Sequence, residues 1–375
     1  MPGMRPNGPS DRIRVLTVDD SLYMRRMLRK MLEGHPRITV IDEAKDGVEA
    51  VAKCISQNPD VMVLDIEMPK MDGLSVLRDI MIKWPLPVVM FSSLTQHGSQ
   101  VTIEALSMGA VDFVPKPVSR TSVSQVAGEL CDKVIQASGA RLRVQEVKHR
   151  HEQARAEKRK AFSGKASVDT LVVIGSSTGG PQALEEIVPN LPQDLPAAVV
   201  ICQHMPKGFT ASLARRLDML SSLKVREAAR EDVLEPGLVL VAPGGYHLRL
   251  DKSPGRERNV YHVYLDEGMI VHGVKPSVDV TLFDAGPLFK ARLMVAILTG
   301  MGSDGAKGAW VARQAGATVI CQDRDTSVIW GMPKACYEAG GSETLVPLDD
   351  MANMIDDFCN RRQAMRNGEK THVTF

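Results

Sequence analysis

The sequence has no apolar run approaching the roughly 20 residues that a bilayer-spanning helix needs. Its 46 Lys and Arg nearly cancel its 45 Asp and Glu, so its charge points neither to nucleic acid nor to a membrane surface. Six cysteines are scattered without a CxxC spacing, which is typical of reduced, buried thiols. Residues Met1 to Arg14 lack the apolar core of a signal peptide. We therefore expect a cytoplasmic protein with no membrane insertion and no nucleic-acid partner.

The length of 375 residues exceeds one ordinary core and favours two domains. Up to about Gly139, short apolar runs alternate with amphipathic stretches such as Ser21–Leu32 and Val48–Gln57. This alternation predicts a parallel sheet with crossover helices on both faces. The expected strands are Arg14–Val18, Thr39–Glu43, Val61–Leu64, Val88–Phe91 and Phe113–Val114.

A second α/β pattern begins at Thr170. Two further runs, His247–Leu250 and Val260–Leu265, flank a turn-rich segment and predict an antiparallel hairpin beside a mostly parallel sheet. The expected strands of that sheet are Leu171–Ile174, Ala198–Cys202, Leu238–Val241, Leu293–Leu298 and Ala317–Cys321.

Between the two patterns, residues 141–165 carry nine Lys or Arg against three Glu. This composition indicates a solvated, partly helical linker, with a docking surface for an acidic partner as the alternative. His149 and His151 have no neighbouring Cys or third His, so we expect no metal site there. The predicted divisions are a tail (1–11), a first domain (12–139), a basic linker (140–168), a second domain (169–361) and a C-terminal tail (362–375).

Polar side chains follow the strands of the first domain. Asp19 and Asp20 end one strand and Asp65 ends another, while Ser92 and Lys116 follow two more. The carboxyl ends of parallel strands meet at one edge of a sheet, so these groups can converge there. Converging carboxylates repel one another, and a hard cation such as Mg²⁺ relieves that repulsion. A hydroxyl and an ammonium beside them suit a phosphoryl group.

Each of these residues alone is weak evidence, because Asp20-Ser21 by itself would indicate only a helix cap. The ordered set, with Glu67-Met68-Pro69 and Met71-Asp72-Gly73, resembles the response-regulator receiver domain, which has a doubly wound, flavodoxin-like fold. The resemblance implies phosphorylation of Asp65. It also implies Mg²⁺ binding by Asp19, Asp20, Asp65 and the Glu67 backbone carbonyl, and phosphoryl contacts from Ser92 and Lys116.

In the second domain, the segment Gly175-Ser176-Ser177-Thr178-Gly179 matches G-x-S-x-G after a strand and before a helix. There a tight turn exposes a serine, and backbone N–H groups with the helix N-terminus favour an oxyanion. A phosphate-binding loop is the rival, but the Gly-Lys-Ser/Thr ending and the G-x-G-x-x-G spacing are both absent.

Two further strands end in groups that could serve a serine nucleophile. His204 follows the strand Ala198–Cys202, and Asp304 lies in the glycine-rich segment Thr299–Gly305. Such triads are recognised by geometry and role, so their chain order can vary. The order Ser, His, Asp argues against the usual α/β-hydrolase fold.

This half resembles the catalytic domain of the chemotaxis protein-glutamate methylesterases through Gly175–Gly180, Gln203–Phe209 and Thr299–Gly305. The resemblance implies that Ser177, rather than the adjacent Ser176, is the nucleophile. It also implies that His204 is the general base and acid, that Asp304 orients it, and that Thr178 and the Met301 backbone N–H are active-site neighbours.

Both resemblances occur in order and cover roughly residues 13 to 360, so the whole chain resembles a chemotaxis response-regulator methylesterase, the CheB family. The family implies hydrolysis of glutamate methyl esters and deamidation of glutamines on chemoreceptors, with a sensor histidine kinase as phosphodonor. Mg²⁺ would serve phosphorylation, with no cofactor for hydrolysis. Two alternatives stay open from the residues alone, a protease and a non-catalytic receptor-binding module.

Overall fold

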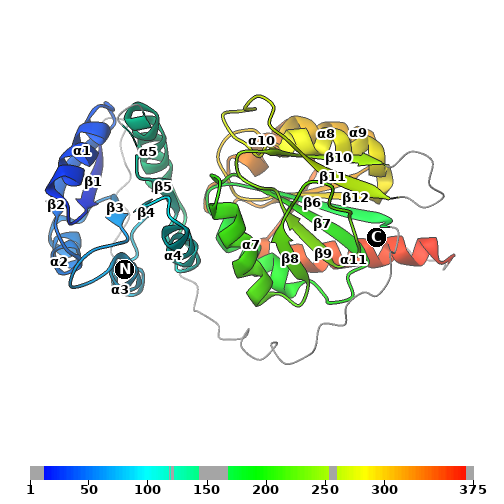
Figure 1. Ribbon diagram of the computed structural model, residues 1–375, viewed down its shortest axis with the longest axis horizontal. Coiled ribbons are helices and arrows are strands. Elements are labelled where there is room, and N and C mark those ends of the chain that lie inside the picture. The colour runs from blue at the N-terminus through cyan, green and yellow to red at the C-terminus, as the bar shows by residue number, and fades with distance from the viewer. Residues whose placement is uncertain (1–11, 118, 120–121, 143–167, 253–259, 369–375) are drawn as a thin grey trace. The chain divides into compact units, whose positions relative to one another are not determined.

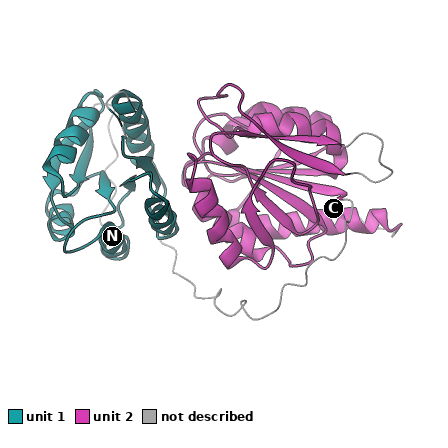
Figure 2. Ribbon diagram, in the orientation of Figure 1, with its two compact units in different colours: residues 1–145 teal, residues 146–375 magenta. Residues whose placement is uncertain are grey.

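The computed structural model describes residues 12–117, 119, 122–142, 168–252 and 260–368. The chain divides into two compact units, residues 1–145 and residues 146–375 (Figure 2). Most of the predicted basic linker, the N-terminal tail and residues 369–375 lie outside the described residues. Among the helices that are described, none has the length and hydropathy of a membrane span.

The first unit is built on a parallel sheet of order β2-β1-β3-β4-β5 (Figure 1). Its strands β3 and β4 are buried along their whole length, as expected for a sheet covered on both faces. The order reverses between β1 and β3, and ligands of such sheets bind at that point. The strands are β1 (Ile13–Val18), β2 (Ile38–Ala44), β3 (Val61–Asp65), β4 (Val88–Ser92) and β5 (Asp112–Pro115).

Helices cover both faces of this sheet, with α1 packed beside α5 and α2 beside α3. Side-chain caps begin four of them, because Ser21, Asp46, Asp72 and Thr95 each accept a backbone N–H of the first turn. The helices are α1 (Leu22–Glu33), α2 (Gly47–Gln57), α3 (Gly73–Lys83), α4 (Gln96–Ser107) and α5 (Val123–Ala137). The predicted receiver architecture is confirmed.

The second unit is built on a parallel sheet of order β14-β13-β12-β6-β7-β9-β8. The chain runs outward from β6 on one side and returns through β12 on the other, so the order reverses between those two strands. The strands are β6 (Thr170–Ser176), β7 (Ala197–Gln203), β8 (Lys224–Glu227), β9 (Leu238–Val241), β12 (Leu293–Ile297), β13 (Thr318–Gln322) and β14 (Thr344–Val346).

Helices α8, α9 and α10 pack together on one side of this sheet, and α6, α7 and α11 on the other (Figure 1). The predicted hairpin is formed by β10 (His247–Lys252) and β11 (Tyr261–Asp266), and it packs on α8. The helices are α6 (Gly180–Ile187), α7 (Phe209–Leu220), α8 (Val278–Phe289), α9 (Ala306–Gln314), α10 (Met332–Glu338) and α11 (Leu348–Arg366), with short 3₁₀ turns η4 (Val188–Asn190) and η5 (Lys290–Arg292).

Three features differ from the sequence-based expectations. The short outer strands β8 and β14 were not expected, because β8 is polar and β14 is only three residues long. Helix α11 continues to Arg366, so residues 362–366, which we expected in the C-terminal tail, are helical. Their polar composition resembles a tail, yet the chain has no helix breaker before Gly368.

Candidate active site and candidate phosphorylation site

Ser177 follows the last residue of β6 and is held through its backbone. Its N–H donates to the Thr299 carbonyl at 3.0 Å, and its own carbonyl accepts from the Gly180 N–H at 2.8 Å. The Gln203 side chain at the end of β7 also donates to that carbonyl, at 2.9 Å. A Cβ at position 180 would lie 2.0 Å from the Gln203 Oε1 and 2.9 Å from the Ser176 Cβ, so a larger residue there would displace the Gln203 side chain.

The two adjacent serines have different environments. Ser176 is fully buried, and its hydroxyl donates to the Gln203 Oε1 at 2.6 Å. Ser177 is partly exposed. Gln203, which the sequence did not single out as functional, therefore sequesters one serine and holds the backbone of the other.

His204 begins the loop after β7, and its backbone N–H donates to the Ser176 carbonyl at 3.0 Å. Its ring Nε2 lies 2.8 Å from the Asp304 Oδ2, and its side chain is 8% exposed. The structure thus joins two of the three predicted residues directly. No hydrogen bond between the Ser177 side chain and His204 is found in the described part of the chain. Such contacts often tighten only when substrate binds.

Asp304 is 2% exposed and accepts four hydrogen bonds. Besides His204, the donors are the Ser277 hydroxyl at 2.7 Å and the backbone N–H groups of Val278 at 2.7 Å and Asp279 at 3.1 Å. These three donors form the N-terminus of α8, whose dipole favours a negative charge. Burial alone would raise the pKa of Asp304, but the hydrogen bonds from His204, Ser277 and Val278 hold it below its usual value. Asp304 is therefore a stably ionised partner for the imidazole.

Because Nε2 faces Asp304, Nδ1 is the imidazole nitrogen left to accept a proton. With a carboxylate at Nε2, the neutral ring carries its proton there, so the arrangement selects one tautomer. The geometry suits general base catalysis by His204.

The two less central predictions lie in the same loops. Thr178 is buried, and its carbonyl accepts from the Thr299 hydroxyl at 2.9 Å. Met301 has an exposed side chain and follows Gly300, where a Cβ would lie 2.7 Å from the Ser177 Cβ. The backbone after β12 therefore runs against Ser177.

In the first unit, the predicted acidic cluster is formed. Carboxylate oxygens of Asp19, Asp20 and Asp65 all lie within 4.8 Å of one another. Lys116 bridges two of them, with its Nζ 3.0 Å from the Asp19 Oδ2 and 2.8 Å from the Asp65 Oδ2. Burial raises the pKa of Asp65 to about 6, and the neighbouring Asp19 charge acts in the same direction while Lys116 opposes it. Oxygen ligands under mutual repulsion fit a hard divalent cation.

Ser92 is fully buried at the end of β4, and its hydroxyl is engaged with α4 rather than with Asp65. Its Oγ lies 2.6 Å from the Thr102 Oγ1 in a hydroxyl–hydroxyl hydrogen bond, and the Thr102 Oγ1 also lies 2.7 Å from the Gly98 carbonyl oxygen. The sequence did not single out Thr102, because a threonine inside a helix carries no signal of its partner. Glu67 is exposed, and its carbonyl follows Asp65 by two residues.

A family model described as CheB methylesterase matches residues 172–355, and one described as response regulator receiver domain matches residues 15–127. The protein-glutamate methylesterase/protein-glutamine glutaminase of Symbiobacterium thermophilum is 46% identical over 354 residues, which is 92% of this chain and 96% of that protein. The Thermotoga maritima protein of the same name is 45% identical over 337 residues, 89% of this chain and 95% of its own. The crystal structure of the Thermotoga maritima CheB methylesterase catalytic domain is 44% identical, with a TM-score of 0.48, over 50% of this chain and 97% of that one.

Proposed function

The chain belongs to the CheB family of protein-glutamate methylesterases/protein-glutamine glutaminases, and on that premise we propose that Ser177, His204 and Asp304 are its catalytic triad. The activity is hydrolysis of glutamate methyl esters, and of certain glutamine amides, in chemotaxis, under control of receiver phosphorylation. The observation that carries the assignment is the buried 2.8 Å contact between the His204 Nε2 and Asp304 beside the loop of Ser177. The substrate is the cytoplasmic part of a methylated chemoreceptor.

In the proposed reaction, the Ser177 Oγ attacks the side-chain carbonyl carbon of the substrate while the His204 Nδ1 takes the hydroxyl proton. The tetrahedral oxyanion is stabilised by the α6 N-terminus and by the backbone N–H groups of Thr178 and Met301. His204 then returns its proton to the leaving group, which departs as methanol or ammonia. Water, activated by the same nitrogen, hydrolyses the acyl-enzyme and releases glutamate.

The matched test uses the two adjacent serines. Methanol release from methylated receptor should fall by several orders of magnitude in Ser177→Ala. Ser176→Ala loses one buried hydrogen bond to Gln203, so it should lower stability by about 1 kcal/mol and retain most activity. Equal losses in the two variants, at equal folded fractions, would reject Ser177 as the nucleophile.

The names of the relatives distinguish between the alternatives. Both relatives described above are named as enzymes, which argues against a non-catalytic receptor-binding module. Their names specify glutamate esters and glutamine rather than peptide bonds, which argues against a protease. A peptide bearing one glutamate methyl ester tests this directly, because a methylesterase should release methanol and leave the backbone intact.

Receiver domains generally bind Mg²⁺ for phosphorylation, and here Asp19, Asp20, Asp65 and the Glu67 carbonyl would hold it. The bound ion would neutralise the carboxylates and the incoming phosphoryl group. Asp65 accepts the phosphoryl group from a sensor histidine kinase. Lys116, already within 2.8 Å of Asp65, pairs with a phosphoryl oxygen.

Ser92 would contact a second phosphoryl oxygen, which requires its hydroxyl to turn away from Thr102. Incorporation of phosphate from a small phosphodonor should need Mg²⁺ and should be lost in Asp65→Asn. Asp72→Asn is the control, because Asp72 is a nearby acid that caps α3 and lies outside the cluster. Full labelling of Asp65→Asn would reject Asp65 as the acceptor.

A further inference from the structure

Asp304 and Asp279 are two buried carboxylates near the His204 imidazole. Asp304 caps α8, which carries Asp279, and Asp279 caps α9, which Asp304 precedes. Asp304, just before α9, accepts from the N-terminus of α8, as described above. Asp279, in the first turn of α8, accepts from the Gly308 N–H of α9 at 2.6 Å. The N-cap of α9 is Gly305, which has no side chain to satisfy that turn. Asp279 therefore supplies from another segment the cap that the α9 sequence lacks.

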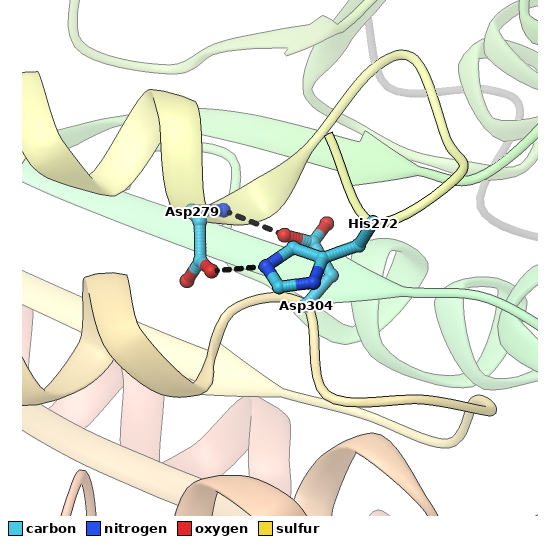
Figure 3. Close-up of side chains that lie close together, drawn as sticks. All are labelled: His272, Asp279 and Asp304. Atoms are coloured by element: carbon cyan, nitrogen blue, oxygen red, sulfur yellow. Dashed lines mark hydrogen bonds and ion pairs between the residues drawn. The ribbon is translucent and has the colours of Figure 1, made fainter. Parts of the chain in front are cut away.

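Asp279 is also joined to Asp304 and to a histidine (Figure 3). Its backbone N–H donates to the Asp304 Oδ1, and its Oδ2 lies 2.9 Å from the His272 Nε2. Asp279 is 1% exposed, and burial raises its pKa, with the charge of Asp304 acting in the same direction. The Gly308 N–H and His272 oppose that shift.

The position of His272 is conformationally costly. Its backbone φ is +52°, in the left-handed region that non-glycine residues seldom adopt. Its side chain is 31% exposed, so solvent alone could hydrate it. The turn at 272–273 instead directs the ring at Asp279, which indicates that the contact has a role.

Hydrogen-bond donors, rather than a cation, account for this cluster. Ligand atoms of His272, Asp279 and Asp304 lie within 4.8 Å of one another, as a metal site would require. Yet both oxygens of each carboxylate already accept a hydrogen bond. Helices α8 and α9 also pack in close contact, because a Cβ at Gly308 of α9 would lie 2.7 Å from the Leu282 Cβ of α8. The pair therefore locks α9 against α8.

We propose that Asp279, oriented by His272, is a positioning residue of the triad: it caps α9 and thereby fixes Asp304 against the His204 Nε2. Asp304 precedes Gly308 by four residues, so freeing the α9 N-terminus loosens the loop that carries Asp304. A displacement of about 1 Å in such a support costs about a hundredfold in rate. This inference rests on the proposed function, since it assumes that Asp304 orients the imidazole.

The first test compares single and double variants of the full chain by methanol release from methylated receptor. Asp279→Ala should lower kcat by about ten- to hundredfold and leave KM within about twofold, because the substrate surface is unchanged. In an Asp304→Ala background, compared at equal folded fraction, the same change should cost less than about threefold, because the side chain that Asp279 positions is then absent. If Asp279 only stabilised the fold and did not act through Asp304, the losses in kcat from the two changes would be additive.

The control lies on the same helix. Asp284 accepts from the Leu250 N–H at 3.1 Å and from Arg249, on the hairpin side of α8. Asp284→Ala removes a partly buried carboxylate of the same helix, 16% exposed, without touching Asp304, so it should lower the unfolding temperature and leave kcat within about twofold.

Conservative variants distinguish the loss of the α9 cap from a general loss of folding. Asp279→Asn keeps an oxygen for the Gly308 N–H and should recover most of the kcat lost in Asp279→Ala. His272→Gln keeps a donor for Asp279 and should exceed His272→Ala in kcat at equal folded fraction. If Asp279→Ala does not fold, these variants still test whether Asp279 positions Asp304.

Wild-type kcat in Asp279→Ala, additive losses with Asp304→Ala, or equal kcat in wild type and His272→Ala would each overturn the inference. Wild-type kcat in Asp304→Asn would instead overturn the proposed triad, so the two failures are distinguishable.

Discussion

The Asp304→Asn variant tests the hydrogen-bond arrangement around the triad. An asparagine presents one acceptor oxygen and one NH₂ group to a site where all four partners donate. If the NH₂ group takes the Oδ2 position, it faces the Val278 N–H and forces the His204 proton onto Nδ1. If it takes the Oδ1 position, only the Asp279 N–H is left unpaired, because the Ser277 hydroxyl can rotate and accept. We expect the second orientation.

This orientation sets the size of the effect. His204 keeps its tautomer and a neutral hydrogen bond, and it loses only the charge assistance of the carboxylate. The difference between a charge-assisted and a neutral hydrogen bond is about 1 to 2 kcal/mol, which corresponds to about a 5- to 30-fold fall in kcat. Trapping the wrong tautomer would cost about 10⁴-fold.

The two asparagine orientations can be distinguished by measuring kcat through methanol release. The variants to compare are Asp304→Asn, Ser277→Ala and the double variant. Without the Ser277 hydroxyl, the preferred orientation of the asparagine is lost, so the double variant should fall well below the product of the single effects. A 10⁴-fold loss in Asp304→Asn alone would refute the reasoning, as would a multiplicative double variant.

Further outcomes are expected from the same site. Ser177→Ala and His204→Ala should each lower kcat by several orders of magnitude, and their combination should add little in the same assay. Gly180→Ala should lower the unfolding temperature and kcat together, because its Cβ would lie 2.0 Å from the Gln203 Oε1. The lowered pKa of Asp304 contributes stability above about pH 4 that is lost as the pH falls, so the gap in unfolding temperature between wild type and Asp304→Asn should shrink below about pH 4. A fragment beginning near Ser167 should be more active than the unphosphorylated full chain and insensitive to phosphodonor; equal rates would show that the receiver does not restrain hydrolysis.

Much of the fold was predictable because buried parallel strands are continuous apolar runs. Strands β3, β6 and β7 are buried throughout, carry polar residues only at their ends, and were located to within two residues. The outer strand β8 was missed because it is short, and its polar residues lie at an edge of the sheet where water is accessible. The hydrophobic pattern therefore locates a strand well where both faces of the sheet are covered, and poorly where the strand is exposed to water.

The sequence by itself determined which strands end in reactive side chains, since Ser177, His204 and Asp65 directly follow or end strongly apolar runs. Glycines beside them marked tight turns in the chain. These are local signals, readable within about ten residues.

Only the tertiary structure decided what surrounds Asp304. Its donors Ser277 and Val278 precede it by more than 25 residues, and they meet it because α8 and α9 pack with their N-termini together. A residue at a helix N-terminus carries no sequence mark of the carboxylate it will bind. For the same reason, the choice of Nε2 as the nitrogen facing Asp304, and the cap that Asp279 provides for α9, come from packing between distant segments rather than from any motif.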